Sequence, residues 1–300
     1  MASAPSTNSH SSDPATGPLG RVVWITGGST GIGKRVAEKL AAQGMKVAVS
    51  ARSADKLAAM ATANSGIFSY PLDVTDADAV TSTIEAIERD LGPIDLALFS
   101  AGIWQVLDVE EVTVEPILRG MEVNFAGTVR PLVPLMHRMM ARKSGRLAII
   151  ASVAGWRGLP RAAAYGPTKA ALISLAETLR PDLVRHNVGV TIINPGFVET
   201  PMTADNDFPM PFIVDVDTAA TKIIRGLERG HYEITFPWQL VTLLKFLSVI
   251  PNRLFLRWMR KFVVQSPEER AAKAEKAKAG PAGQPHEAGE AGSARKATST

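Results

Sequence analysis

A tyrosine and a lysine, Tyr165 and Lys169, lie four positions apart in a stretch of helical periodicity, so their side chains share one helix face. A neighbouring cation favours the phenolate and lowers a phenol pKa from its ordinary value of about 10, which suits proton transfer. Ser152 ends an apolar run thirteen residues upstream, and its hydroxyl could hydrogen-bond an oxygen that gains negative charge. Taken alone, the pair more often means a tyrosine at the core edge beside a solvated lysine.

A glycine-rich loop, Thr26-Gly27-Gly28-Ser29-Thr30-Gly31-Ile32-Gly33, separates an apolar run from a helical pattern. Glycines here permit a turn with positive φ, a close approach of the backbone to a pyrophosphate, and tight packing of helix on strand. The helix N-terminus then offers free N–H groups to phosphates. This placement after a strand and before a helix indicates a dinucleotide site.

The next strand ends in Ser50-Ala51-Arg52-Ser53, where NAD-binding folds place a carboxylate that holds the ribose 2′-hydroxyl. Arg52 instead suits the 2′-phosphate of NADP through charge-assisted hydrogen bonds. The alternative is a solvated arginine at a helix start.

The elements that must position these residues alternate along the chain. Apolar runs at 21–26, 46–51, 66–70, 95–100, 146–151, 190–194 and 232–236 predict strands, and helical patterns lie between them, near 54–63, 76–90, 112–140, 162–186 and 216–229. This alternation predicts an α/β fold: a single doubly wound (Rossmann) domain over residues 20–236, with a seven-stranded parallel sheet covered by helices on both faces.

The motifs together resemble the short-chain dehydrogenase/reductase family over about residues 20–235. The glycine loop, Ser100-Ala101-Gly102, Asn124, Ser152, Tyr165, Lys169 and Asn194-Pro195-Gly196 occur in the family's order with its approximate spacings. Two positions depart from it. Ser100 stands where the family commonly has asparagine, and Thr30 stands where many NADP-preferring members carry a basic residue.

The resemblance implies a catalytic set and a cofactor, NADP(H). Tyr165 would be the acid in reduction and the base in oxidation, and Ser152 would bond the substrate oxygen. Lys169 would lower the pKa of Tyr165 and bond the nicotinamide ribose, and Asn124 would hold a water that links Lys169 to solvent. The implied cofactor-binding residues are Gly27, Ser29, Thr30, Gly31, Ile32, Arg52, Asp73, Ala101, Gly102, Tyr165, Lys169, Pro195, Gly196, Val198 and Thr200. Asp73 could equally cap a helix that begins near residue 75.

The expected substrate pocket lies beyond the carboxyl ends of the strands, between segments 103–105, 153–159 and 201–212. Its candidate substrate residues are Trp104, Trp156, Leu159, Phe208 and Phe212. Such side chains favour a bulky hydrophobic ketone, aldehyde or alcohol, although some of them could simply pack against a lid. The chain's ending resembles members that act on steroids, long-chain ketones or sphingoid ketones, which would place the enzyme in lipid metabolism.

Residues 237–265 form an apolar and basic extension. Of the 300 residues, those from 236 to 265 include five basic and no acidic side chains, although the whole chain has a net charge of only +4. Arg253, Arg257, Arg260 and Lys261 fall on one helical face, opposite Phe255, Trp258, Met259 and Phe262. This amphipathic helix could lie in a membrane interface, or pack on the domain or on a second subunit.

Composition excludes several classes of protein. The chain has no cysteine, so disulfides, thiolate zinc sites and a cysteine nucleophile are excluded. No histidine pattern indicates a metal site, and no motif indicates nucleic-acid binding. We expect a disordered leader at 1–19, a disordered tail at 266–300, a cytoplasmic location that could include the membrane surface, and, from the family resemblance, a homodimer or homotetramer.

The leading prediction is an NADP(H)-dependent oxidoreductase that interconverts a carbonyl group and an alcohol on a small hydrophobic molecule. Two alternatives stay open. One is a non-catalytic NADP-binding scaffold or redox sensor, and the other is a membrane-surface protein that binds through its C-terminal extension.

Overall fold

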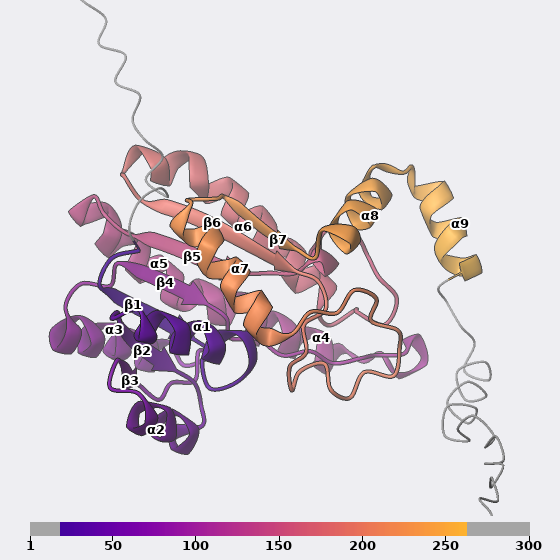
Figure 1. Ribbon diagram of the computed structural model, residues 1–300. Coiled ribbons are helices and arrows are strands. Elements are labelled where there is room, and N and C mark those ends of the chain that lie inside the picture. Colours follow the sequence, from indigo (N-terminus) through magenta and orange to yellow (C-terminus); the bar gives the residue numbers. More distant parts are fainter. Residues whose placement is uncertain (1–18, 263–300) are drawn as a thin grey trace, which may run out of the picture. The chain divides into compact units, whose positions relative to one another are not determined.

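The computed structural model describes residues 19–262 and contains one seven-stranded sheet with every strand parallel (Figure 1). The strands are β1 (Val22–Thr26), β2 (Lys46–Ser50), β3 (Ile67–Ser69), β4 (Leu96–Phe99), β5 (Arg146–Ile150), β6 (Gly189–Pro195) and β7 (Glu233–Phe236). Their order is β3-β2-β1-β4-β5-β6-β7. The predicted doubly wound fold is therefore confirmed, and its strand order reverses between β1 and β4, where such sheets bind ligands.

Helices cover both faces of the sheet. The described helices are α1 (Gly31–Ala42), α2 (Ala54–Ala63), α3 (Ala77–Leu91), α4 (Val114–Gly120), α5 (Gly127–Arg142), α6 (Gly166–Arg185), α7 (Val216–Glu228), α8 (Trp238–Val249) and α9 (Asn252–Phe262), with short turns η1 (Val109–Glu111) and η3 (Val153–Gly155). Leu40 of α1 and Ile223 of α7 are buried on one face, and Ile84 of α3, Leu135 of α5 and Leu172 of α6 are buried on the other.

The segment near 112–140 differs from the single helix that its pattern predicts. The structure has α4, then the π-helical turn η2 (Met121–Ala126), then α5. In a π-helical turn the backbone hydrogen bonds span five residues instead of four, which inserts one extra residue without ending the helix. The apolar periodicity therefore continues through the turn. The turn matters because Asn124 lies within it.

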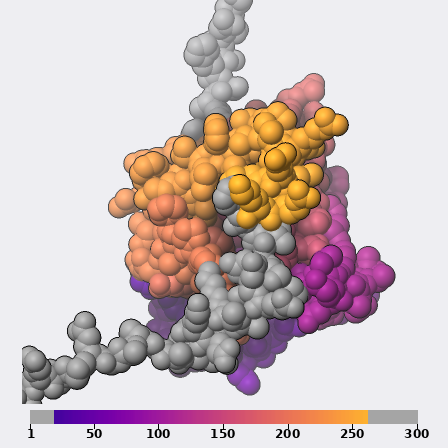
Figure 2. Space-filling model, turned by 90° about the vertical axis from the view of Figure 1, so that its right-hand side faces the viewer, coloured from indigo at the N-terminus to yellow at the C-terminus, as the bar shows by residue number. Residues whose placement is uncertain are grey.

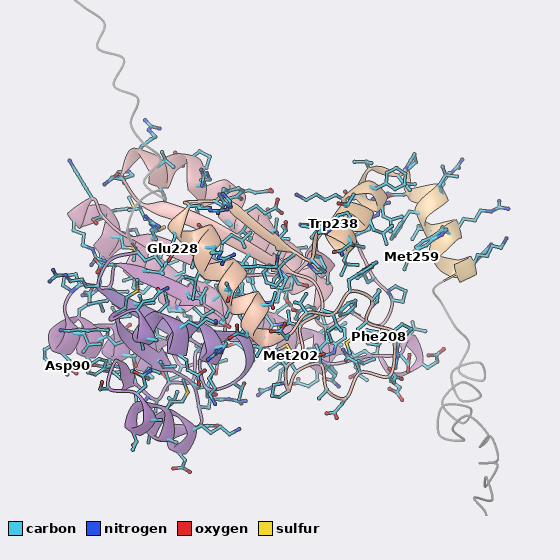
Figure 3. The ribbon with its side chains drawn as sticks, viewed as in Figure 1. Asp90, Met202, Phe208, Glu228, Trp238 and Met259 are labelled. Carbon is cyan, nitrogen blue, oxygen red and sulfur yellow. The ribbon has the colours of Figure 1, made fainter. Side chains whose placement is uncertain are left out.

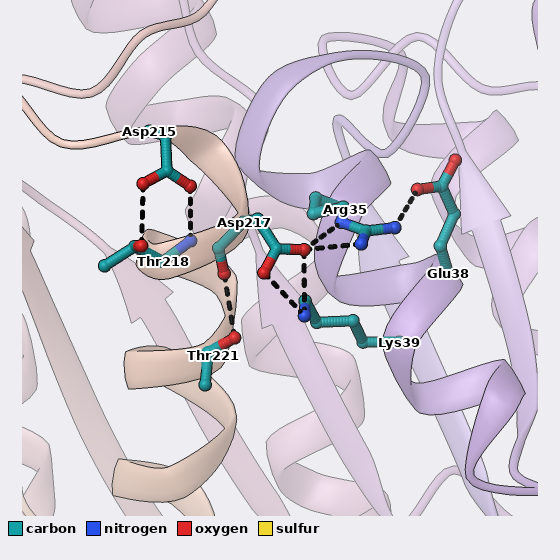
Figure 4. A network of polar contacts seen from close by, with 7 residues as sticks. All are labelled: Arg35, Glu38, Lys39, Asp215, Asp217, Thr218 and Thr221. Carbon is teal, nitrogen blue, oxygen red and sulfur yellow. Dashed lines mark hydrogen bonds and ion pairs between the residues drawn. The ribbon is translucent and has the colours of Figure 1, made fainter.

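Polar contacts fix α7 against α1 (Figure 4). Asp215 caps α7, accepting a 2.8 Å hydrogen bond from the Thr218 N–H. Asp217, in the first turn of α7, accepts hydrogen bonds from Arg35 Nε at 2.7 Å and Lys39 Nζ at 3.0 Å. These contacts join α7 to α1, the helix that follows the glycine loop, on one face of the sheet.

The ends of the chain correct one expectation. Leu19 was predicted to belong to the leader, but it is buried in the core with only 3% of its surface exposed. Residues 1–18, 263–265 and the predicted tail 266–300 lie outside the described residues. The chain divides into two units after Leu256, and all packing described below lies within the first unit.

Candidate active site

Ser152, Tyr165 and Lys169 come together at the carboxyl end of β5. Ser152 follows this strand, Tyr165 is the N-cap residue of α6, and Lys169 lies one turn further along. The Tyr165 and Ser152 hydroxyls share a hydrogen bond. The Ser152 hydroxyl also donates to the Pro195 carbonyl at 3.3 Å, which ties the catalytic group to the end of β6.

Lys169 is a buried cation, with 4% of its surface exposed. Its Nζ donates a 2.8 Å hydrogen bond to the Ile150 carbonyl and lies 5.3 Å from the centre of the Tyr165 ring. Burial lowers the pKa of Lys169 to about 8, because the charged form loses its hydration. The ammonium group is therefore positioned beside the phenol by β5 as well as by its own helix.

The pKa of Tyr165 is the clearest departure from expectation. We expected Lys169 to lower it, but burial raises the pKa of Tyr165 to about 12, and the hydrogen bond with Ser152 offsets only part of that rise. The physical reason is desolvation, which penalises the phenolate. At neutral pH the phenol therefore keeps its proton and is ready to donate it.

Asn124 is fully buried in the π-helical turn η2. Its Oδ1 accepts from the Ile103 N–H at 2.7 Å, and its Nδ2 donates to the Ile103 carbonyl at 3.0 Å and to Thr168 Oγ1 at 3.2 Å. Thr168 Oγ1 in turn donates to the Tyr165 carbonyl at 2.7 Å. Asn124 thus joins the segment after β4 to the start of α6. Its predicted role in holding a water stays a prediction.

The glycine loop fits a dinucleotide. Gly27 and Gly31 have φ values of +67° and +55°, in the left-handed region that favours glycine. A Cβ at Gly27 would lie 2.5 Å from the Ala101 nitrogen, and one at Gly31 would lie 3.3 Å from Thr200 Cγ2. Thr30 makes no side-chain cap, and the first turn of α1 has no acidic residue. The N–H groups of that turn therefore remain available to a phosphate.

Arg52 is exposed after β2, and Asp73 lies within its electrostatic reach. A hydrogen bond from the Thr75 N–H lowers the pKa of Asp73, with further lowering from the charges of Arg52 and Arg119. Asp73 does not cap the next helix, as one alternative supposed. Asp76 caps α3, accepting from the Ala79 N–H at 3.0 Å.

The other predicted cofactor residues lie around the same end of the sheet. Ser29, Thr30 and Gly31 line a hollow together with Lys34, Lys56 and Pro201. Pro195 ends β6, and the Gly196 N–H donates to the Phe236 carbonyl at 2.7 Å. Val198 is buried, Ile32 packs against the core, and a Cβ at Gly102 would lie 3.8 Å from Lys169 Nζ.

Two of the five predicted substrate residues gather beside the phenol. The ring centre of Trp104 lies 5.0 Å from that of Tyr165, nearly perpendicular at 84°, and 6.3 Å from that of Phe208. Trp156 lies under Lys245 of α8, at 5.2 Å from its Nζ. Leu159 is half-buried. Phe212 is 50% exposed, with a φ of +59°.

Four contacts around this aromatic cluster were not predicted. Asn206 Oδ1 accepts a 2.8 Å hydrogen bond from Trp104 Nε1, and Phe197 packs against Phe208 at 6.1 Å between ring centres. Arg161 is ion-paired to Asp108 at 2.9 Å and to Asp207 at 2.7 Å. Arg161 thus links the segment after Trp104 to the segment that carries Phe208. Phe208 is labelled in Figure 3. Nothing in a single sequence marks such long-range pairs.

The arrangement can protonate an oxygen held beside Trp104, because a neutral phenol, a serine hydroxyl and a buried ammonium group converge there. It lies at the same sheet edge as a glycine loop suited to phosphates. Both features lie at the carboxyl ends of the strands, where doubly wound sheets bind their ligands.

Comparison with known proteins supports this combination. Residues 21–208 match the short chain dehydrogenase family. An uncharacterized oxidoreductase of Myxococcus xanthus is 36% identical over 239 residues, which covers 78% of this chain and 94% of the relative. A 3-oxoacyl-(acyl-carrier-protein) reductase, MabA, of Mycobacterium bovis is 34% identical over 185 residues, covering 62% of this chain and 72% of the relative.

Solved structures share the fold. An alcohol dehydrogenase from Thermococcus sibiricus complexed with 5-hydroxy-NADP is 25% identical, with a TM-score of 0.65 over 72% of this chain and 95% of that one. A short chain dehydrogenase/reductase from Burkholderia phymatum in complex with NAD has a TM-score of 0.69 at 22% identity, over 75% of this chain and 92% of that one. On the family match, the close relatives and the fold, this chain belongs to the short-chain dehydrogenase/reductase family of oxidoreductases.

Proposed function

We propose that this chain is an NADP(H)-dependent carbonyl reductase that acts on a bulky hydrophobic ketone or aldehyde, of a steroid-like, long-chain or sphingoid kind. The observation that carries the proposal is the placement of the Tyr165 phenol, which is bonded to Ser152, flanked by Lys169 and packed against the Trp104 ring. A phenol that keeps its proton can act as the acid in carbonyl reduction.

The proposed chemistry assigns a task to each side chain. Bound NADPH would supply the hydride. Ser152 donates a hydrogen bond to the substrate carbonyl oxygen and stabilises the negative charge that develops there. Tyr165 transfers its hydroxyl proton to that oxygen as it becomes an alcohol. Lys169, held at the Ile150 carbonyl, stabilises the phenolate left behind by its positive charge.

The preference for NADP rests on positive charge near the glycine loop. Thr30 supplies none, but Lys34 and Lys56 line the hollow next to it, and Arg52 follows β2. Glu38 lines the same hollow and lies 3.8 Å from Lys34, which offsets part of this charge. The residues therefore suit a 2′-phosphate with Arg52 as its main partner.

Replacing Arg52 tests the cofactor assignment. We expect Arg52→Ala to raise the KM for NADPH roughly tenfold or more, the usual loss for a hydrogen bond to a charged group, and to leave the KM for NADH nearly unchanged. Lys56→Ala should have a smaller effect in the same direction. An equal loss with both cofactors would contradict a role at the 2′-phosphate.

The substrate preference rests on Trp104 and Phe208, which form an apolar wall beside Tyr165. The decisive experiment is a panel of bulky and small ketones and aldehydes assayed with NADPH and with NADH. We expect turnover of bulky apolar carbonyl compounds with NADPH and its loss in Tyr165→Phe. Tight NADPH binding without turnover of any compound would favour a scaffold or redox sensor instead. The cytoplasmic location and the homodimer or homotetramer stay predictions.

A further inference from the structure

The outward face of α8 is mostly apolar, although Thr242 and Lys245 are also exposed on it. Its large apolar members are Trp238, Leu243, Phe246 and Val249, which are 73%, 46%, 63% and 76% exposed. Trp238 marks the start of this helix in Figure 3. A helix that covers a core normally turns charged or polar residues to water, whereas the inward face of α8 is apolar as well, with Leu240, Leu244 and Leu247 buried. The outward face is therefore built to contact something other than water.

The charged side chains of the segment that carries this face are all basic. Residues 236–265 contain no acidic side chain. Lys245 is paired with Glu233 at 2.7 Å, but Arg253, Arg257 and Arg260 are exposed. Their spacing places these three arginines on one side of α9. The first turns of α9 also expose Leu254 and Leu256, at 61% and 63%.

This pairing of apolar and basic residues matches an anionic lipid surface. Apolar side chains enter the boundary between headgroups and acyl chains, and nearby arginines attract anionic headgroups. A second copy of the chain is a poorer match, because a two-fold contact would set the same basic residues against each other. Among residues 19–262, no helix is long and apolar enough to cross a bilayer.

The inward side of α8 touches the loops of the active site. The Arg157 guanidinium donates to the Ser248 carbonyl at 3.2 Å and to the Ile250 carbonyl at 3.0 Å, and it lies 4.2 Å from the centre of the Phe255 ring. Arg157 belongs to the loop that begins at Ser152. A Cβ at Gly196, after β6, would lie 2.7 Å from Leu240. The surface segment that contains α8 is orange in Figure 2.

We propose that the outward face of α8 docks on an anionic phospholipid bilayer, and that the exposed arginines that follow it in the sequence attract the anionic headgroups. The loops that carry Ser152 and Gly196 then lie directly behind the docked helix, so an apolar substrate dissolved in the bilayer is close to the catalytic group. The proposed docking depends only on the exposed apolar and basic residues, whereas the delivery of substrate to the catalytic group rests on the proposed function.

Vesicle co-sedimentation of the full chain tests the docking. The vesicles are phosphatidylcholine alone, or phosphatidylcholine with phosphatidylserine. We expect at least roughly tenfold stronger binding to the anionic vesicles, weakened by salt, since each arginine near the surface contributes about 1 kcal/mol. Phe246→Ser with Val249→Ser should abolish the binding. The matched control, Val114→Ser with Leu118→Ser, changes side chains of α4 that are 71% and 58% exposed and should bind like the wild type.

A second variant protects the test against misfolding. Arg253→Gln with Arg260→Gln keeps every apolar residue and should lose roughly 30-fold in binding to anionic vesicles. Binding that is absent, that is equal on both vesicles, or that the α4 control also loses would overturn the proposal. A further outcome would also overturn it: the wild-type chain does not bind vesicles but forms a dimer, and the α8 variant is a monomer. The outward face would then be an interface between two copies of the chain.

Activity separates this proposal from the proposed function. The α8 variant should reduce a small water-soluble ketone at the wild-type rate, while anionic vesicles should lower the KM for a bulky apolar ketone only in the wild type. A chain that binds anionic vesicles but turns over no ketone would refute the proposed function and leave the docking intact.

Discussion

The catalytic cluster and the outward face of α8 depart in opposite directions from the usual division of residues between core and surface. In the cluster, the polar side chains of Asn124, Ser152 and Lys169 are buried and hydrogen-bonded. On α8, Trp238 and Phe246 are largely exposed. The first arrangement costs desolvation free energy and the second forgoes the stabilisation of burial.

The neighbouring helix α7 shows what an ordinary surface helix does in this fold. Ile223 and Leu227 face the sheet, and Asp217 on its other side forms ion pairs with α1 (Figure 4). The contrast shows that neither departure is required by the sheet. The catalytic cluster and the outward face of α8 both lower the stability of the fold. Such departures are expected at sites of binding and catalysis.

The largest expected effect breaks the catalytic cluster. Ser152→Ala removes the hydrogen bond to the developing alkoxide and should lower kcat by about 10² to 10³, the usual loss of one such donor. The free energy of unfolding should change by about 1 kcal/mol at most. Steady-state kinetics and urea unfolding measure the two quantities. A variant that kept wild-type kcat would remove Ser152 from the mechanism.

The two faces of α8 give the next largest effect. Leu244→Ala should lower the free energy of unfolding by about 2 to 5 kcal/mol, because it leaves a cavity in a buried site. Phe246→Ala, on the outward face of the same helix, should change it by about 0.5 kcal/mol at most. Equal losses measured by urea unfolding would show that the outward face is already covered within one chain.

Lys169 should make stability depend on pH. Its folded pKa of about 8 lies below the unfolded value of about 10.4, so the unfolded chain binds more protons between these values. Stability from this site is therefore lowest below about pH 8 and rises with pH. From about pH 8 to about pH 10, the wild type should gain about 2 kcal/mol relative to Lys169→Met. Urea unfolding at both pH values measures the gain, and a constant difference would argue against a buried ammonium group.

The smallest effect belongs to the surface pairs of α7. Asp217→Asn removes its ion pairs with Arg35 and Lys39, but Asp217 is 50% exposed and solvent screens its charge, so the loss of stability should be small, and smaller still at high salt. Thermal unfolding at two salt concentrations provides the measurement. A loss as large as that of Leu244→Ala would mean that α7 is held by charge rather than by its apolar face.

The sequence was sufficient to predict the sheet because each strand is a short apolar run and parallel strands carry such runs when both faces are covered. The family resemblance of the motifs also implied that Ser152 and Tyr165 would meet. The sequence did not predict the π-helical turn around Asn124, because an extra residue in a helical turn leaves the apolar pattern intact.

Contacts between distant residues were also beyond reach. Arg161 with Asp207, Trp104 with Asn206, and Arg157 with the end of α8 join residues 46 to 102 positions apart. A single chain gives no signal for such pairs. The pKa of Tyr165 was predicted in the wrong direction for a related reason: the pattern revealed the neighbouring cation but not the degree of burial.

The most direct test of the central claim is the ionisation of the Tyr165 phenol itself. The chain has three tyrosines, so the difference between the ultraviolet pH titrations of the wild type and Tyr165→Phe isolates this group. A half-buried phenol with a pKa of about 12 should show no phenolate up to about pH 10 while the protein stays folded. A phenolate signal that appears below about pH 9 would contradict a proton-donating Tyr165 and the reductive function built on it.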